Sequence, residues 1–301
     1  IRHTGGSADN ITLDNSQNVT VEGNATVDGN LTATGTTTIS GYHPTTSRSN
    51  RNLVTNGEFQ VAQRSSAVAA SSDMVTVDRF GVSAANHDAG ADQAQVALTS
   101  SDTGPWAKGH RFAYQLTNGD QTGGAGTSDK MEIYTKLEAQ DIASSGWDYT
   151  STSSYITLSF WVKSSVAQNF HGYLLTDDVS TRSYAFETGS LSANTWTKVT
   201  KTIPGNANLG FNNDNGLGLT INFCQFLGTG LTGTAGTLNT WVSYTSTQRT
   251  PDQTSTWWTT NDATFALTGI QLEVGDTATD YEHRSYGDEL ARCQRYYYQE
   301  S

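Results

Sequence analysis

The pattern of hydrophobic and polar positions divides the chain into two regions with different periods. From Asn52 onward, apolar and polar residues alternate in short runs, which turn residues interrupt about every ten positions. Alternation of this kind is typical of strands with one buried face, and the regular turns indicate a sandwich or barrel. From Val19 to Tyr42 the chain repeats a unit of six residues instead. We therefore predict a large all-β domain that follows a short repetitive segment.

The clearest strand of the large domain is the run YITLSFWVK, from Tyr155 to Lys163. Successive residues of a strand point to opposite faces, so one apolar set should form the core while Trp161 lies on the other face. A turn at Thr176 to Asp178 joins two further strands. The same alternation predicts these core positions: Ile156, Leu158, Phe160, Val162, Leu217, Leu219, Ile221, Phe223, Phe112, Tyr114, Leu116, Met131, Ile133 and Leu137.

The run TFALTGIQLEV changes phase at Gly269. Phe265 and Leu267 occupy one alternation, and the apolar residues after the glycine, up to Val274, occupy the opposite one. A β-bulge at the glycine would keep both sets in the core. Near the C-terminus the apolar residues take a helical period, and Ser285 precedes them as a suitable N-cap. We predict a bulge at Gly269 and a short C-terminal helix.

The N-terminal repeat places a glycine at every sixth position from Gly23 to Gly41, in the units VTVEGN, ATVDGN, LTATGT and TTISGY. Positions one and three of each unit point the same way along an extended strand, and the glycine permits a turn. This register aligns the apolar residues Val19, Val21, Ala25, Val27, Leu31, Ala33 and Ile39. One ribbon is too thin to bury them, and a single-chain β-helix needs about three such units in each of several coils.

Three identical chains wrapped about one axis would bring these apolar positions together. We therefore predict that residues 1–44 form an N-terminal strand and an intertwined, trimeric β-helix or β-prism shaft. A flexible linker is the alternative interpretation of the repeat. Residues 45–51 are polar and lack a period, which predicts a linker, and residues 52–301 form the sandwich. The contacts between chains are assigned to Val19, Val21, Val27, Leu31 and Ile39.

Composition and charge exclude two classes of partner. Charged residues make up 15% of the chain, and 29 Asp and Glu against 17 Lys and Arg give a formal net charge of −12. A surface of this sign repels a nucleic-acid backbone, and no apolar run approaches the ~18 residues that membrane insertion requires. Two cysteines, Cys224 and Cys293, are too few for a disulfide framework. The chain begins at Ile1, so we expect a processed product or a longer native polypeptide.

Several segments of the large domain resemble the C-terminal domains of tail fibre and related virion structural proteins of tailed bacteriophages. They are, in order, NLVTNGEFQVAQR, VDRF, KLEAQDI, YITLSFWVKSS, RSYAFE, NTWTKVTKTIPG, NGLGLTINF and FALTGIQLEVGDTATDYEHRSYGDELARCQRYY. The glycine-punctuated repeat resembles fibre shafts of the same class. The resemblance implies a jelly-roll β-sandwich, similar to carbohydrate-binding modules, on a trimeric fibre at the virion surface, with no catalytic residues. By analogy with sugar-binding jelly rolls that hold structural calcium, it implies Glu58 and Glu273 as calcium ligands.

Aromatic residues in or beside a loop rich in Ser and Thr are candidate glycan contacts: Trp241, Tyr244, Trp257 and Trp258. Aromatic faces stack on the C–H surface of a pyranose ring, and a loop without a core period gives little structural reason for three tryptophans. The alternative is that these side chains pack over the end of the sandwich or against a neighbouring subunit. Trp161 either faces a binding surface or packs against another protomer.

No motif in the sequence indicates an enzyme or a histidine metal site. The six histidines show no paired spacing, so we do not expect them to bind metal. The leading hypothesis is a non-enzymatic phage tail fibre or appendage protein on the outer side of the virion. Its partners would be two further copies of itself, other virion proteins, and a host cell-surface glycan or protein. A purely structural virion component, such as a head fibre, cement or adaptor protein, and a polysaccharide depolymerase are the alternatives.

Overall fold

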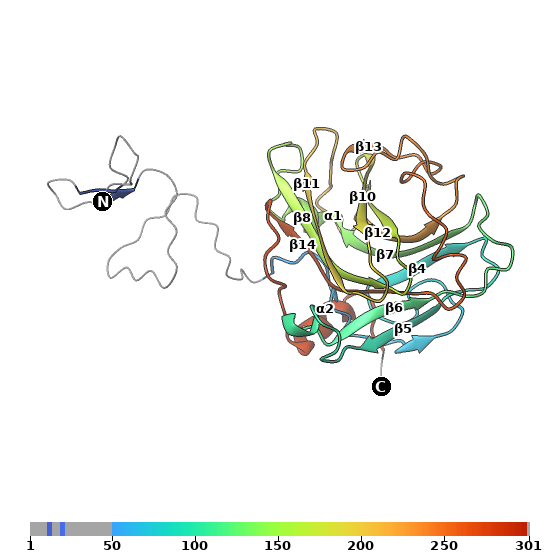
Figure 1. The fold of residues 1–301 in the computed structure, drawn as a ribbon. Helices are drawn as coiled ribbons and strands as arrows, with labels where there is room; N and C mark the ends of the chain where they lie inside the picture. Colours follow the sequence, from blue (N-terminus) through green and yellow to red (C-terminus); the bar gives the residue numbers. More distant parts are fainter. Residues whose placement is uncertain (1–10, 14–18, 22–49, 300–301) are drawn as a thin grey trace, which may run out of the picture. The chain divides into compact units, whose positions relative to one another are not determined.

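A computed structural model describes residues 11–13, 19–21 and 50–299 (Figure 1). The chain divides into two compact units, Ile1–Pro44 and Thr45–Ser301, which are considered separately. In the first unit, β1 (Ile11–Leu13) and β2 (Val19–Val21) pair antiparallel, with Ile11 opposite Val21. The remaining shaft positions Val27, Leu31 and Ile39 lie outside the described residues, so the trimeric shaft stays a prediction.

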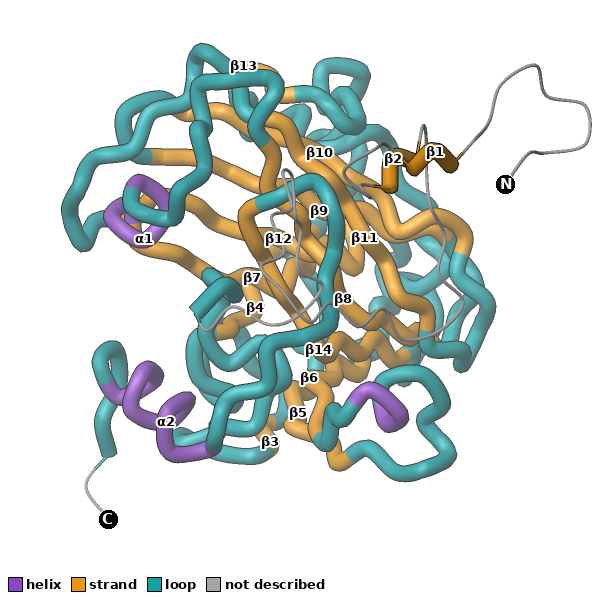
Figure 2. Tube along the Cα trace, turned by 90° about the vertical axis from the view of Figure 1, so that its left-hand side faces the viewer, coloured by secondary structure: helices purple, strands orange, loops and turns teal. Residues whose placement is uncertain are grey.

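The second unit is a β-sandwich like a jelly roll, which confirms the predicted all-β class. The first sheet has the order β13-β10-β9-β12-β7-β4, and the second has the order β11-β8-β14-β6-β5-β3. Neighbouring strands within both sheets run antiparallel, and Figure 2 shows the strands of the first sheet side by side. The strands are β3 (Ala67–Val68), β4 (Phe80–Ala85), β5 (Asp92–Ala97), β6 (Phe112–Thr117), β7 (Lys130–Glu138), β8 (Tyr155–Ser164), β9 (Asn169–Asp177), β10 (Thr181–Ser190), β11 (Thr197–Pro204), β12 (Leu217–Leu227), β13 (Trp241–Ser243) and β14 (Thr264–Val274).

Helices are short in the described part of the chain. They are the 3-10 turn η1 (Trp106–Lys108), α1 (Ala139–Ala143) and α2 (Tyr286–Gln294). The helix predicted after Ser285 is confirmed as α2, and the Ser285 side chain accepts a hydrogen bond from the Asp288 backbone N–H at 3.2 Å, which caps its first turn. None of the helices that the structure describes has the length and hydrophobicity to cross a membrane.

The core lies between the two sheets, and it contains the side chains that alternation predicted. Ile156, Leu158, Phe160 and Val162 of β8 are all fully buried. They face the other sheet, where the rings of Phe160 and Phe223 meet edge to face with centroids 5.0 Å apart. The predicted core positions at two strand starts, Leu217 and Phe112, are half-buried.

The phase change in β14 is the predicted β-bulge. Pairing with β8 shifts register between Thr268 and Gln271, and Gly269 has a φ of +61°, which a side chain rarely tolerates. Residues on both sides of the bulge therefore reach the core: Phe265, Leu267, Ile270 and Leu272. The inward assignment of Val274 is wrong. It is 39% exposed because it is the last residue of the strand, where the chain leaves the core for a turn.

Residues 50–61 are hydrogen-bonded to residues 270–289 along their length, and we call this pair of segments the clasp. Asn52 Nδ2 donates to the Ile270 carbonyl at 3.1 Å, and its Oδ1 accepts from the Leu272 N–H at 3.1 Å. The Asn52 backbone N–H donates to Glu282 at 2.8 Å. These groups are buried, and their desolvation is unfavourable unless each finds a partner. The clasp therefore specifies one arrangement of the two segments.

A buried ion cluster completes the clasp. Arg284 lies 3.1 Å from a Glu282 oxygen and 3.4 Å from a Glu289 oxygen, and all three side chains are at most 8% exposed. Glu289 also accepts a hydrogen bond from the backbone N–H of Asn56. One arginine thus pairs with two carboxylates, and both carboxylates also accept hydrogen bonds from the backbone at the start of the sandwich.

Replacing Arg284 with methionine is expected to lower the free energy of unfolding by about 3 to 5 kcal/mol, because Glu282 and Glu289 would keep buried charges without their partner. Urea denaturation followed by tryptophan fluorescence measures the change. Lys136→Met is the matched control, because it removes the same charge from an exposed position on β7 and should cost less than about 0.5 kcal/mol. Equal losses in the two variants would contradict this account of the clasp.

Candidate functional site

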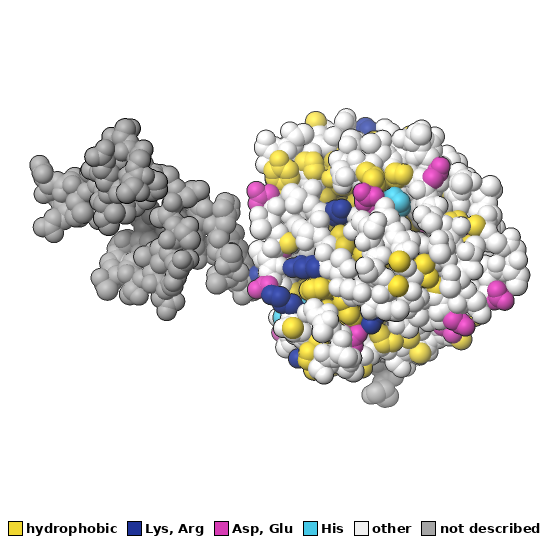
Figure 3. Space-filling view, viewed as in Figure 1, with side chains coloured by type: hydrophobic (Ala, Val, Ile, Leu, Met, Phe, Trp, Pro, Cys, Tyr) yellow, Lys and Arg dark blue, Asp and Glu magenta, His cyan; other side chains and the backbone are white. Residues whose placement is uncertain are grey.

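Trp161 lines a pocket of about 250 Å³ on the outer face of the second sheet. It lies on β8 opposite Lys198 of β11, and a Cβ placed at Gly104 or at Gly269 would come within 2.7 Å or 3.3 Å of its ring atoms. These two glycines therefore allow backbone to pass close to the indole. The polar side chains that line the pocket with it are Ser159, Lys198, Lys108, Thr279, Asp280, Tyr281, His110 and His283. Figure 3 shows Lys and Arg side chains near exposed apolar surface on one face of the sandwich.

Asp102 attaches one wall of the pocket, residues 99–110, to the sheet. Its Oδ1 accepts hydrogen bonds from Lys163 Nζ at 2.8 Å and from Trp196 Nε1 at 2.9 Å. Burial alone would raise the pKa of this carboxyl. The hydrogen bonds from Lys163, Trp196 and the Thr99 backbone outweigh that effect and lower the pKa to about 2. Asp102 therefore stays ionised and holds the wall in place.

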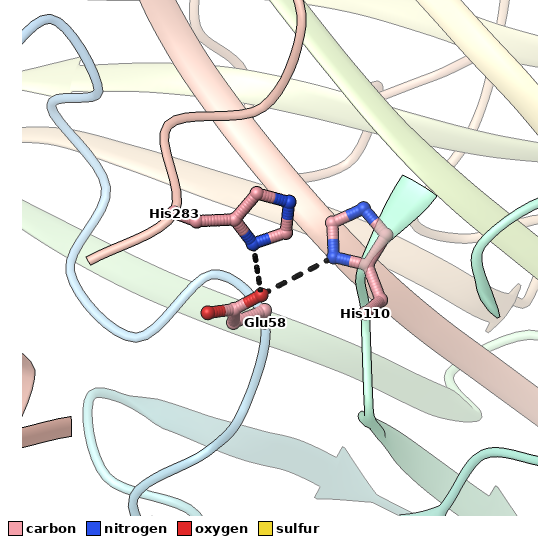
Figure 4. A group of neighbouring side chains, drawn as sticks. All are labelled: Glu58, His110 and His283. Atoms are coloured by element: carbon pink, nitrogen blue, oxygen red, sulfur yellow. Dashed lines mark hydrogen bonds and ion pairs between the residues drawn. The ribbon is translucent and has the colours of Figure 1, made fainter. Parts of the chain in front are cut away.

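Two histidines that line the pocket, His110 and His283, meet the carboxylate of Glu58, as Figure 4 shows. Glu58 Oε2 lies 3.0 Å from His283 Nδ1 and 3.4 Å from His110 Nδ1. His110 is buried, whereas the His283 side chain is 43% exposed. The hydrogen bond with Glu58 raises the pKa of His283 above its ordinary value. Burial raises the pKa of Glu58, but the hydrogen bonds with both histidines leave it lowered overall.

Two of the predicted glycan contacts are core residues. Trp257 is 0% exposed and Trp258 is 1% exposed. The Trp258 ring stacks on Phe226 with centroids 5.1 Å apart, and its Nε1 donates to the Gly124 carbonyl at 2.8 Å. The prediction that Trp257 and Trp258 contact glycan is wrong for this structure, because a ring without accessible surface cannot stack on a sugar.

Trp241 and Tyr244 also pack on the protein itself. Trp241 is 7% exposed, and its Nε1 donates to the Pro204 carbonyl at 2.7 Å. Tyr244 is half-buried and stacks on Tyr173 with centroids 6.5 Å apart. For Trp241, the structure therefore supports the alternative interpretation, packing on the protein, over contact with a glycan. Of the five predicted contact residues, Trp161 is the one that lines the pocket beside the second sheet.

The two glutamates predicted to bind calcium have separate partners. Glu273 accepts hydrogen bonds from the Thr279 N–H at 2.9 Å and the Thr279 hydroxyl at 2.6 Å, and it pairs with Arg51 at 3.4 Å. Glu58 is grouped with His110 and His283 instead. The structure therefore does not bring Glu58 and Glu273 into one cluster of potential ligands, and structural calcium stays an untested expectation.

Sequence spacing missed the grouping of His110 with His283. The two histidines lie in loops before β6 and before α2, far apart in the chain, and these loops meet where His283 Nε2 lies 2.8 Å from the Lys108 carbonyl. Spacing rules for metal motifs do not cover histidines in separate loops, so the sequence held no signal for this pair.

Comparisons with known proteins give distant likenesses. No family model matches the chain, and no curated protein sequence matches it. Among solved structures, the enzymatically active domain of tailspike protein 4 of bacteriophage CBA120 is 10% identical over 75% of this chain, with a TM-score of 0.37. This chain spans 22% of the length of that tailspike structure.

Two carbohydrate-binding modules are similar at the same level. The family 11 module of a Clostridium thermocellum cellulosomal cellulase is 13% identical over 71% of this chain and 95% of its own, with a TM-score of 0.33. A xylan-binding domain from Paenibacillus barcinonensis is 10% identical over 77% of this chain and 100% of its own, with a TM-score of 0.34. The fold is assigned as a β-sandwich from the strand pairing within this chain and not from these likenesses.

Asp102→Asn is expected to lower the free energy of unfolding at pH 7 by on the order of 1 kcal/mol. Because folding lowers the pKa of this carboxyl, its stabilising contribution is present above pH 3.8 and is lost as the pH falls through about 2. Urea denaturation at several pH values between 5 and about 2 should therefore show a weaker pH dependence in the variant. Asp120→Asn, at an exposed position, is the control, and an equal change there would contradict the assignment.

Proposed function

We propose that the protein is a non-enzymatic, trimeric tail fibre or appendage component of a bacteriophage virion, and that its sandwich domain binds a host-surface glycan. The observation that carries this proposal is the Trp161 pocket. A partly exposed indole with ammonium, carboxylate and hydroxyl groups around it is the combination that holds a sugar ring and its hydroxyls. The phage assignment and the trimer rest on the sequence resemblance and on the hexad repeat.

The pocket composition favours binding over cleavage. Among the described residues that line it, Asp280 is the one carboxylate, whereas glycoside hydrolysis generally uses a pair. Asp280 also forms an ion pair with Lys108 at 3.2 Å. A small pocket binds weakly by itself, and three copies on one fibre would supply avidity.

A purely structural virion role is the second candidate, and one observation favours it. Three tyrosines at and after α2 expose much of their surface: Tyr286, 56%; Tyr296, 40%; and Tyr298, 63%. Aromatic side chains of this kind are enriched in protein interfaces. A structural role would use this surface to contact other virion proteins and would leave the Trp161 pocket without a ligand.

Trp161→Ala is expected to weaken glycan binding at least about 5-fold, because loss of an aromatic platform removes a stacking contact of about 1 kcal/mol or more. A glycan array with the full chain identifies the ligand, and titration calorimetry with that glycan measures the change. Tyr298→Ala is the matched control, since it removes an exposed aromatic ring elsewhere. A folded wild-type protein that binds no glycan would favour the structural role.

The full chain is expected to have three times its monomer mass of 32.3 kDa in solution. The aligned apolar residues of the repeat would supply the contacts, so Val27→Asp together with Leu31→Asp should give monomers. Analytical ultracentrifugation measures the mass of both forms. A monomeric wild-type chain would contradict the predicted shaft, while leaving the test of glycan binding unaffected.

A further inference from the structure

Glu58, His110 and His283 come from three separate segments and point toward one another (Figure 4). Each offers one potential ligand atom, and the three atoms lie within 4.8 Å of one another. Glu58 and His283 belong to the two segments of the clasp, and His110 follows η1. The convergence is therefore produced by the tertiary fold.

The hydrogen position on His283 is set by a backbone group. His283 Nε2 lies 2.8 Å from the carbonyl oxygen of Lys108, which can accept a hydrogen bond but cannot donate one. Nε2 must therefore carry a hydrogen, and the lone pair of the neutral ring is on Nδ1. That lone pair points at the Glu58 carboxylate 3.0 Å away. A nitrogen lone pair and a carboxylate oxygen repel each other at this distance. A proton or a metal ion must therefore lie between them.

The same arrangement is found around protein-bound metal ions. A histidine ligand usually donates its second ring N–H to a carbonyl or carboxylate, which fixes the ring and directs the other nitrogen at the metal. Tetrahedral zinc has bonds of about 2.0 to 2.2 Å to nitrogen and oxygen, so its ligand atoms are about 3.3 to 3.5 Å apart. The separations of Glu58 Oε2 from the two histidine nitrogens, 3.0 Å and 3.4 Å, are close to that spacing, and all three atoms lie within 4.8 Å of one another.

We propose that Glu58 Oε2, His110 Nδ1 and His283 Nδ1 bind a divalent transition metal ion of the zinc class. Two imidazoles and one carboxylate are a donor set that suits zinc, whereas calcium takes six to eight oxygen ligands. Three protein ligands leave a fourth position for water or another donor. This site differs from the predicted calcium pair, and it goes beyond glycan binding.

The surroundings hold the three ligands in place without the ion. His110 packs edge to face on Tyr281 with ring centroids 4.9 Å apart, and its backbone N–H donates to the Pro105 carbonyl at 3.1 Å. Glu58 is fixed by the clasp. A bound ion would join the two segments of the clasp to the wall of residues 99–110, so metal binding should stabilise the folded domain.

The test uses the full chain, freed of metal with a chelator and then titrated with Zn²⁺ by calorimetry and with Co²⁺ by visible absorption. One ion per chain, a visible spectrum typical of tetrahedral Co²⁺ and a higher Tm with Zn²⁺ are the expected results. Glu58→Gln and His283→Ala should each lower the Zn²⁺ affinity at least about 10-fold. Ca²⁺ should not compete.

His87→Ala is the matched control, because it removes a histidine outside the cluster and should leave Zn²⁺ affinity unchanged. Near-ultraviolet circular dichroism checks the fold of each variant, and the partly exposed position of His283 makes its replacement the milder one. Unchanged Zn²⁺ affinity in both folded cluster variants would overturn the proposal. Absence of Zn²⁺ and Co²⁺ binding by the wild type would also overturn it, and a proton on His283 would then supply the charge.

Discussion

The clasp is the interaction on which the rest of the described sandwich depends. Its amides and charges are buried, and they are stable there because specific partners satisfy them, across the two segments for Asn52 and within one segment for the Arg284–Glu282 pair. A hydrophobic core tolerates small shifts of one layer over another, but a set of directional bonds does not. Because Glu58 belongs to the same segment as Asn52, the clasp also determines where that carboxylate meets the two histidines.

Local rules account for what the sequence could predict. The alternation of β8 identified its buried face residue by residue, since side chains in a strand must alternate between faces. The bulge at Gly269 could be predicted because the alternation of apolar residues changes phase there, and a regular strand would then place one of the two apolar sets outside the core. The N-cap at Ser285 is equally local, because the serine acts on a backbone group three residues away.

What the sequence could not predict depends on contacts between distant segments. The loop around Trp257 and Trp258 shows no period, yet it folds back so that both rings are buried. Periodicity identifies buried faces of strands and helices, and it carries no information on irregular segments. The grouping of His110 with His283 is similarly invisible to spacing rules, because it arises from a contact between the loops before β6 and before α2. The shaft has a clear period, and its positions Val27, Leu31 and Ile39 lie outside the described residues.

The clasp also has a mechanical consequence. Tension that reaches the sandwich from residues before Asn50 would act first on the backbone N–H groups of Asn50, Asn52 and Asn56, all of which are bonded to glutamates of one C-terminal segment. Bonds pulled along the direction of the chain share the load and rupture together, which resists force better than opening them one at a time. Asn52 is also bonded to Ile270 and Leu272 of β14, so the same segment would pass the load to the second sheet.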